Sequence, residues 1–390
     1  MRKFIKKTIL ANINRFLILY FSLRKRTPKP GPVTIVGILK TATGLGAAAR
    51  LTLETFRKLG YNTTYFDASK LFTKNFIVTL LPDKLKKEEG GVLVIQNNPI
   101  HLPIILFLIG FAKFKNKKII LYSVYELEDI PKSWVKPCKL VDEIWAPSDF
   151  AAEAYRKSIP RKEVRVVPHF VCADRPEMDV NSNKSIKILS IIDINSGFYR
   201  KNPMAAIKLF SKVNNPNVEF VLKISGGEKN KKYYDMILDA ASNIQNLTII
   251  YRKLPDQEKD DLISSSDILV SLHRSEGFGL ILAESMLLGT PILCTGWSAP
   301  PMFLPEDCAS YVKYKLIDVE DPQGKYENRG KWADPDLEDA IQKLNKLIED
   351  KKFRDQLSRK ALTHAREYFS DKNFEKWVRE SEVIREYAES

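Results

Sequence analysis

Short apolar runs rich in valine and isoleucine alternate with helix-like segments along most of the chain, and this alternation most constrains the fold. Such runs are buried on both faces, as in parallel sheets that helices cover on each side. They occupy Val33–Leu39, Val92–Gln96, Lys118–Val124, Asp142–Ser148 and Val164–His169, and again Ile186–Asp193, Val218–Ser225, Leu247–Tyr251, Asp267–Leu272 and Thr290–Thr295. The sequence therefore predicts an α/β protein of doubly wound, Rossmann-like construction.

The alternation forms two blocks, which predicts two domains. A chain of 390 residues is too long for one ordinary core, and a polar segment around Pro176 interrupts the pattern. We predict a basic amphipathic N-terminal segment over residues 1–30, a Rossmann-like domain over 31–172 and a linker over 173–185. A second such domain follows over 186–368, and a C-terminal helix over 369–390.

Basic residues are concentrated in the first half, although the net charge of the whole chain is +14. Residues 1–30 hold nine basic and no acidic side chains, which favours an anionic partner. The apolar stretches Phe16–Leu23 and Pro103–Ala112 lie among these cations but are shorter than the ~20 residues that span a bilayer. They predict helices that lie on an anionic membrane surface. The alternative is a buried helix with a solvated basic end.

The four cysteines lie far apart and form no CxxC or Cys/His pattern. This spacing argues against a zinc site or a disulfide framework and fits a reducing compartment. No small-residue cleavage site follows Phe16–Leu23, so we expect no secretory signal. We therefore expect a cytoplasmic protein without a metal cofactor.

Two glutamates flank a glycine-rich turn in the stretch HRSEGFGLILAESMLLGTPIL, which runs from His273 to Leu293. Glu276 follows a predicted strand, at the edge where open α/β sheets bind ligands, and precedes the N-terminus of a helix, where a phosphate is favoured. Glu284 stands inside that apolar helix, where a carboxylate needs a partner or a ligand. The alternative is a dipole-stabilised acid and an ordinary exposed helix residue.

Two further loops carry candidate binding groups. In NSGFYRKNP, Arg200 and Lys201 follow a strand and are suited to neutralise a diphosphate, or they form a solvated pair. In TATGLGAAAR, Gly44 and Gly46 fit the dinucleotide fingerprint, and Asp67 ends the next strand where a ribose-binding acid would stand. Four residues separate the strand from Gly44, which weakens the dinucleotide interpretation.

The motif EGFGLILAE followed by GTPIL resembles the two-glutamate signature of retaining nucleotide-sugar glycosyltransferases with the GT-B fold, family four (glycosyl transferases group 1), of the type that assembles bacterial polysaccharides. DEIWAPSDF, VVPH and RKNPMAAIKLF, in this order, extend the resemblance over most of residues 33–370. The resemblance implies a GT-B fold, in which two Rossmann-like domains face each other across a cleft. It also implies that the first domain binds the acceptor, the second binds the donor, and the C-terminal helix crosses back to the first domain.

The resemblance also implies roles for individual residues. Glu276 contacts the transferred sugar, with Lys201 and Arg200 at the diphosphate as catalytic residues, although Asn195 or Ser196 stands where the family has an arginine. Donor-binding residues are Glu284 at the ribose, Gly277, Phe278, Gly279 and Leu280, Gly44 and Gly46, and Lys253 and Leu254 at the base. Sugar or acceptor contacts are expected from Glu126, Tyr125, Asn98 and His273, with Glu126 near the position of a family histidine.

These observations together predict a metal-independent, retaining glycosyltransferase. Its donor is a nucleotide-diphospho-sugar, and its acceptor is a glycan or a lipid-linked sugar. The basic first half predicts a peripheral position on the inner face of the cell membrane, and no nucleic-acid reader motif is present. The alternatives are an NAD(P)-dependent oxidoreductase that uses the Gly44-x-Gly46 loop, and a non-catalytic module that binds membranes or anions.

Overall fold

The computed structural model describes residues 2–41, 43–69, 89–173, 185–327 and 329–389, with residues 2–11 and 229 described by their backbone alone. The chain divides into two compact units. Unit 1 comprises Met1–Tyr125, Asp129–Phe170 and Asp371–Ser390, and unit 2 comprises Glu126–Glu128 and Val171–Ser370. Residues 174–184 of the predicted linker lie outside the described residues.

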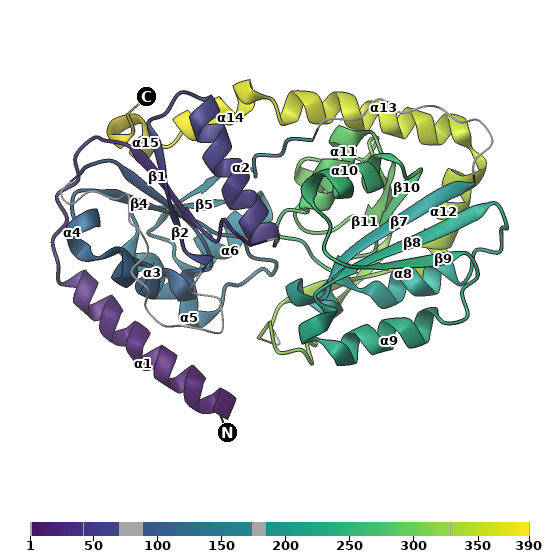
Figure 1. The fold of residues 1–390 in the computed structure, drawn as a ribbon, viewed down its shortest axis with the longest axis horizontal. Coiled ribbons are helices and arrows are strands. Elements are labelled where there is room, and N and C mark those ends of the chain that lie inside the picture. Colours follow the sequence, from purple (N-terminus) through teal and green to yellow (C-terminus); the bar gives the residue numbers. More distant parts are fainter. Residues whose placement is uncertain (1, 42, 70–88, 174–184, 328, 390) are drawn as a thin grey trace. The chain divides into compact units, whose positions relative to one another are not determined.

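Unit 1 is built on a six-stranded parallel sheet with the strand order β2-β1-β3-β4-β5-β6 (Figure 1). The strands are β1 Val33–Gly37, β2 Thr63–Asp67, β3 Val92–Gln96, β4 Lys118–Tyr122, β5 Glu143–Ala146 and β6 Glu163–Val166. Every residue of β1 and β3 is buried, as their continuous apolar runs predict.

The helices of unit 1 are α1 Arg2–Ser22, α2 Gly44–Lys58, α3 Leu102–Ile109, α4 Phe111–Phe114, α5 Lys132–Val135, α6 Asp149–Ser158, α14 Asp371–Arg379 and α15 Glu382–Tyr387. The predicted single helix over 369–390 is therefore two helices. Ser381 separates them because its hydroxyl oxygen accepts a hydrogen bond from Ile384 N at the start of α15. The C-terminal segment packs against the N-terminal part of the unit, with Gly31 N donating to Tyr387 O at 3.1 Å.

Unit 2 contains a second six-stranded parallel sheet, with the order β12-β11-β10-β7-β8-β9. Its strands are β7 Ile186–Asp193, β8 Val218–Ser225, β9 Leu247–Tyr251, β10 Ile268–Ser271, β11 Ile292–Thr295 and β12 Ser310–Val312. The chain runs outward from β7 in one direction and from β10 in the other. These two neighbours are therefore the topological switch point of the sheet.

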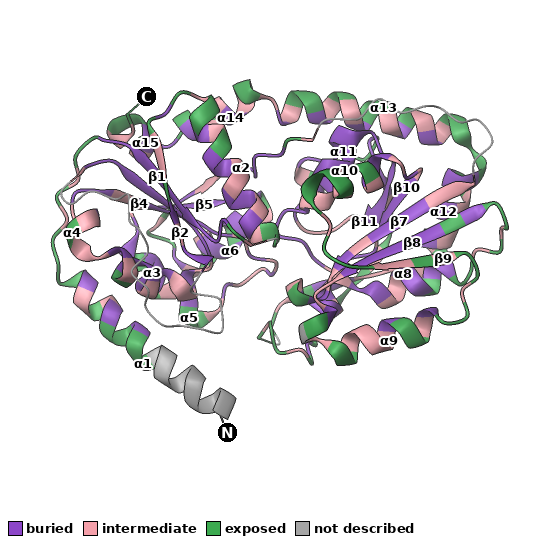
Figure 2. Cartoon of the chain, in the orientation of Figure 1, coloured by how far each residue is buried: buried purple, intermediate pink, exposed green. Residues whose placement is uncertain are grey.

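The helices of unit 2 pack on both faces of this sheet, and buried residues fill the strands between them (Figure 2). They are α7 Phe198–Lys201, α8 Pro203–Phe210, α9 Lys231–Ala241, α10 Asp256–Ser264, α11 Leu280–Leu288, α12 Leu337–Glu349 and α13 Lys351–Tyr368. An antiparallel hairpin, β13 Tyr314–Asp318 and β14 Lys331–Pro335, lies between β12 and α12 in the chain. Among the described residues, none of the helices is long and apolar enough to traverse a membrane.

Candidate functional site

The loops after β7 and β10 leave the sheet at its switch point, where open α/β sheets bind their ligands. The first loop carries Arg200 and Lys201, and the second carries Glu276. Asn202 joins the loops, because its side-chain amide donates to Leu272 O at 3.1 Å. Arg274 N donates to Arg200 O at 2.7 Å and fixes the same junction.

Glu276 is held between two cations. Its Oε1 lies 2.6 Å from Lys201 Nζ and its Oε2 lies 3.0 Å from Arg200 Nη1, while Glu276 itself is only 7% exposed. Burial alone would raise the pKa of this carboxyl, but the charges of Arg200 and Lys201 lower it to about 2. Ser298 supports the backbone by accepting a hydrogen bond from Glu276 N at 2.8 Å. The carboxylate is therefore ionised and fixed in position.

Arg200 is buried and surrounded by acceptors. Its Nη1 donates to Ser275 O at 2.7 Å and its Nη2 donates to Ser196 O at 3.0 Å. Burial alone would lower the pKa of the guanidinium, but Glu276 and other anionic groups raise it. This geometry shows Arg200 positioning Glu276 and the β10 loop, and a direct contact with a diphosphate stays a prediction.

Lys201 has a different environment, because its side chain is 22% exposed and approaches a single carboxylate, that of Glu276. Its amine ends a flexible chain, whereas the guanidinium of Arg200 is fixed by backbone carbonyls. Of these two cations, Lys201 is therefore the one whose charge is free to turn toward an incoming anion.

The glycine-rich turn places backbone, and not side chains, at the start of α11. Gly279 has a φ of 102°, which favours glycine, and α11 begins at Leu280 without a side-chain cap. The first amides of this helix and its positive dipole end can therefore receive an anion. Phe278 is 2% exposed and its ring stacks on Phe303 at 4.8 Å, so its aromatic side chain belongs to the core. Gly277 is buried in the same turn.

Glu284 lies within α11 and is 6% exposed, so it is not an ordinary exposed helix residue. Lys259, on α10, approaches its Oε1 at 2.7 Å. The other carboxylate oxygen, Oε2, is buried without a hydrogen-bond partner among the described residues. Burial raises the pKa of Glu284, against the opposing charge of Lys259. One oxygen of a buried carboxylate is thus available to a hydroxyl donor.

Three lysines near these loops were not predicted from the sequence. Besides Lys259, Lys223 on β8 is 8% exposed, and burial lowers its pKa. Lys325, from the β13–β14 connection, donates to Asn195 O, and Gln323 of the same connection accepts from Phe198 N at 2.9 Å. No local pattern marks these residues, because each reaches the site from an element distant in sequence.

Glu126 belongs to unit 2, although it was predicted within the first domain. Its backbone oxygen accepts from Ser275 Oγ, and its carboxylate lies 3.7 Å from Arg200 Nη2. These contacts explain the assignment to unit 2. Burial raises the pKa of Glu126, against the lowering charge of Arg200. The structure thus brings Glu126, Arg200, Lys201 and Glu276 together.

Other predicted residues of unit 2 lie in less specific surroundings. His273 is fully buried beside Ser271 Oγ at 3.1 Å, and burial lowers its pKa to about 4, so it is neutral at pH 7. Lys253 is exposed and Leu254 half-buried in the loop between β9 and α10. This loop leads directly into the helix that carries Lys259.

The predicted residues of unit 1 follow the carboxyl ends of its strands. Gly44 begins α2, and Gly46 packs so tightly that a Cβ there would lie 2.9 Å from Ile38 O. Asn98 is half-buried after β3, whereas Tyr125, after β4, is 5% exposed and packs on Trp134 with ring centroids 4.9 Å apart. Gly46 therefore has a packing role, whereas Gly44 is exposed, and the ligand contacts of all four residues stay predictions.

Asp67, which the dinucleotide interpretation needs, is engaged locally. Its Oδ1 accepts from Ser69 N at 3.0 Å and from Ser69 Oγ at 2.5 Å. This carboxylate therefore shapes the turn after β2, and the geometry does not favour a ribose at Asp67.

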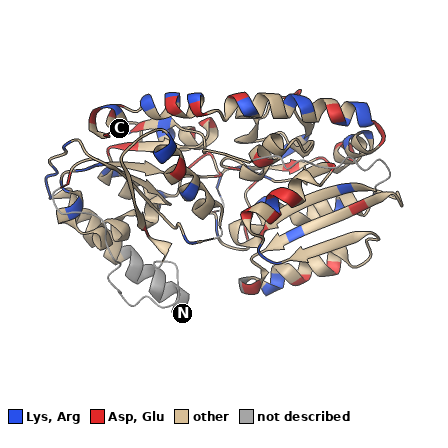
Figure 3. Cartoon of the chain, turned by 45° about the horizontal axis from the view of Figure 1, so that its top comes forward, with Lys and Arg blue, Asp and Glu red and all other residues tan. Residues whose placement is uncertain are grey.

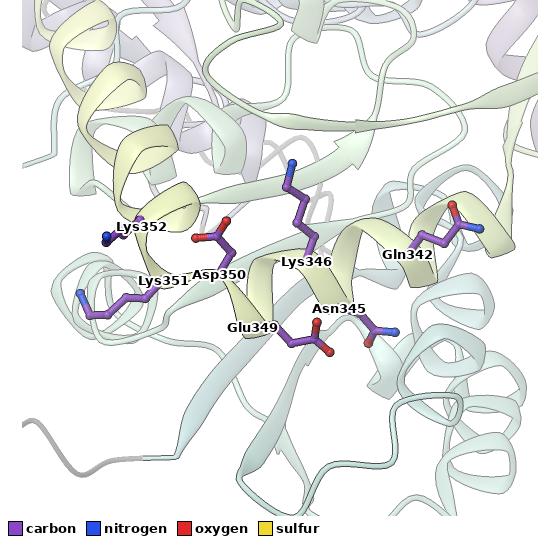
Figure 4. Close-up of a pocket in the computed structure, with 7 residues that line it drawn as sticks. All are labelled: Gln342, Asn345, Lys346, Glu349, Asp350, Lys351 and Lys352. Atoms are coloured by element: carbon purple, nitrogen blue, oxygen red, sulfur yellow. The ribbon is translucent and has the colours of Figure 1, made fainter.

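A surface hollow on α12 and the start of α13 contains none of the predicted residues (Figure 4). It is lined by Gln342, Asn345, Lys346, Glu349, Asp350, Lys351 and Lys352. The side chains of Lys346 and Glu349 point in opposite directions in Figure 4, and Lys346 Nζ lies 4.0 Å from the centre of the Phe353 ring. The side chains that line this hollow do not point toward one common position where a ligand could bind.

Comparison with known proteins gives a family match that lies in unit 2. Residues 174–304 match the family described as glycosyl transferases group 1. The chain is 26% identical to alpha-1,3/1,6-mannosyltransferase alg2 of Schizosaccharomyces pombe over 40% of this chain and 37% of that protein. It is 32% identical to glycosyltransferase 48 of Sulfolobus islandicus filamentous virus, over 33% of this chain and 40% of that protein. The matches thus span less than half the length of these two relatives.

The fold has relatives among solved structures. Anabaena Alr3699/HepE, crystallised with UDP and glucose, aligns with a TM-score of 0.61 over 90% of this chain and 98% of that one, at 12% identity. The matched family segment contains Lys201 and Glu276 and all of α11. Residues 174–304 therefore resemble the glycosyl transferases group 1 family, and the fold is that of the GT-B glycosyltransferases.

Proposed function

We propose that this protein transfers a sugar from a nucleotide-diphospho-sugar to a glycan or lipid-linked acceptor, with retention and without a metal ion. The observation that carries the proposal is the carboxylate of Glu276, held by Lys201 and Arg200 beside the uncapped start of α11. When the donor binds, its diphosphate interacts with the charged amine of Lys201 and with the first amides of α11. These groups supply the positive charge that a metal ion would otherwise bring to the leaving group.

The weak basicity of Glu276 supports the proposal of retention. A carboxylate with a pKa of about 2 is a poor acceptor of protons at pH 7, so it orients the sugar hydroxyls and does not activate the acceptor. In the proposed reaction the bond between the anomeric carbon and the diphosphate oxygen breaks. The acceptor oxygen bonds to the same face, and its proton passes to the departing diphosphate. The anomeric configuration of the donor would be preserved.

Glu284 is the proposed ribose-binding residue. Its unpaired Oε2 can accept hydrogen bonds from ribose hydroxyls, while Lys259 compensates its charge. Lys253 and Leu254 would meet the base, chiefly through their backbone. UDP is the first nucleotide to test, because the similarly folded Anabaena protein was crystallised with UDP and glucose.

We further propose an acceptor in polysaccharide assembly and a peripheral position on the inner face of the cell membrane. Asn98 and Tyr125 are the candidate acceptor contacts in unit 1, and Glu126 is a separate candidate sugar or acceptor contact. The excess of basic residues in the first half supports an anionic membrane as the location.

Thermal unfolding with UDP, GDP, ADP and NAD tests the donor site. We expect one nucleoside diphosphate to raise the melting temperature of the wild type and to have little effect on Glu284→Gln. Glu349→Gln, at the end of α12, is the matched control and should respond like the wild type. Stabilisation by NAD alone would contradict the proposal and support the oxidoreductase. If no nucleotide changes the melting temperature, the non-catalytic anion-binding module is the interpretation that remains. With the base known, the anomeric configuration of the product, measured by NMR, tests retention.

A further inference from the structure

Helix α1 presents a second apolar face that nothing in the described structure covers. Its inner face packs on the unit, with Leu17 5% and Phe21 7% exposed, and Asn14 Nδ2 donates to Ile100 O at 2.9 Å. Its outer face carries Ile13, Phe16, Leu19 and Leu23, which are 43%, 66%, 58% and 77% exposed. Figure 2 shows this change between buried and exposed residues along the described part of the helix. Large apolar side chains clustered in water mark a contact surface.

The charges around this face have one sign. Arg15, Arg24 and Lys25 are exposed beside it, and residues 1–30, α3 and α4 contain no acidic residue. Figure 3 shows no red residue on α3. On α3, Phe107 is also exposed, at 59%. Apolar side chains among cations are typical of helices that lie in the interface of an anionic bilayer.

A groove of about 390 Å³ opens next to the end of α1. Its apolar lining consists of Ile18, Phe21, Leu106, Phe111, Phe114, Ile119 and Leu140. The cations Lys136 and Lys139 are exposed at its edge, and the guanidinium of Arg24 lies 4.2 Å from the centre of the Tyr20 ring. The charge of Arg26, which also lines the groove, is compensated by Asp142 at 2.6 Å. An apolar groove with a cationic edge suits an anionic phospholipid, with part of an acyl chain in the groove and the headgroup at its edge.

We propose that the outer face of α1, Phe107 and this groove form a docking surface for an anionic phospholipid bilayer. Phe16, Leu19, Leu23 and Phe107 enter the acyl boundary, and Arg24, Lys136 and Lys139 contact headgroup phosphates. A protein partner is disfavoured because, among the described residues, the exposed charges beside the apolar face and at the edge of the groove are positive. The inference deepens the membrane location proposed above and does not depend on sugar transfer.

Vesicle sedimentation of the full-length protein tests this surface. We expect binding to vesicles of phosphatidylcholine and phosphatidylglycerol and little binding to phosphatidylcholine alone. Phe16→Ser/Leu19→Ser should weaken binding roughly tenfold or more, because two apolar side chains no longer enter the bilayer. Arg24→Gln/Lys136→Gln/Lys139→Gln should weaken it by roughly fivefold for each charge removed. The control Leu316→Ser/Ile317→Ser removes two exposed apolar residues from β13 and should bind like the wild type.

A second measurement reports insertion directly. The emission of Phe16→Trp should shift to the blue with the anionic vesicles, whereas that of Leu316→Trp should not. Unchanged binding of Phe16→Ser/Leu19→Ser, or equal binding of the wild type to neutral vesicles, would overturn the inference. Nucleotide-induced stabilisation of Phe16→Ser/Leu19→Ser should persist, so failure of the docking surface is distinguishable from failure of the donor site.

Discussion

Lys259 Nζ lies 2.7 Å from Glu284 Oε1 and joins α10 to the middle of α11. The side chains of the two residues are 20% and 9% exposed, so the pair is largely removed from water. The lysine compensates the charge of a carboxylate that would otherwise be buried alone, and it leaves Oε2 open.

Removal of this lysine should therefore destabilise unit 2. We expect Lys259→Met to lower the free energy of unfolding by roughly 2–3 kcal/mol, less than the loss for a fully buried pair because Lys259 is partly exposed. Urea unfolding at pH 7 measures this effect. Lys231→Met, which breaks an exposed pair with Asp235, is the control and should unfold like the wild type.

A double substitution separates charge from packing. Lys259→Met/Glu284→Gln also removes the buried charge of Glu284, so we expect part of the stability lost in Lys259→Met to return. The return is partial because Asp260, whose carboxylate lies 3.4 Å from Lys259 Nζ, still loses its cation. An equally unstable double variant would show that the methylene chain of Lys259, and not its charge, stabilises this region. Nucleotide binding should stay weak in the double variant, because Glu284 is lost.

The low pKa of Glu276 predicts a dependence of stability on pH. Its pKa is about 2 in the folded protein against an ordinary value of 4.5, so its contribution is present above about pH 4.5 and lost as the pH falls through 2. This shift corresponds to at most about 3 kcal/mol. Between pH 4.5 and 2, the free energy of unfolding should fall more in the wild type than in Glu276→Gln. Parallel curves would contradict the ion cluster.

The exposed cation of the site should matter more for catalysis than for folding. We expect Lys201→Met to lower kcat roughly 10²–10³-fold, because the departing diphosphate loses its mobile charge partner. Lys208→Met, in the exposed part of α8, makes the same chemical change outside the site and should leave kcat unchanged. Steady-state kinetics with the donor found by thermal unfolding provides the measurement. A reduction confined to KM would assign Lys201 to ground-state binding.

The glycine loop of unit 1 should be sensitive to a single methyl group. A Cβ at Gly46 would contact Thr41 O and lie 2.5 Å from Thr41 Oγ1, so Gly46→Ala should cost about 1–3 kcal/mol. Gly44 is exposed at the first position of α2, and Gly44→Ala should change the free energy of unfolding by less than about 0.5 kcal/mol. Equal losses in both variants would contradict the packing role of Gly46.

The α/β fold could be predicted because its determinants are local. The buried run of β3 and the glycine that ends α11 specify elements within a few residues. The position of Glu276, between the end of a strand and the start of a helix, is likewise specified by nearby residues. The break between the two C-terminal helices was not predicted from the sequence, because Ser381, which caps α15, also donates to Glu143 Oε2, an acceptor 238 residues away.

The sequence by itself determined which elements form and which loops follow the carboxyl ends of strands. Only the tertiary structure decided how the charges pair there. The contacts of Glu276 with Lys201, and of Glu284 with Lys259, span 75 and 25 residues. Side-chain periodicity reports which face of an element is buried, whereas such long-range pairs depend on how strands are ordered in the sheet. For the same reason the sequence assigned Glu126 to the first domain, and its contacts with Arg200 and Ser275 place it in the second.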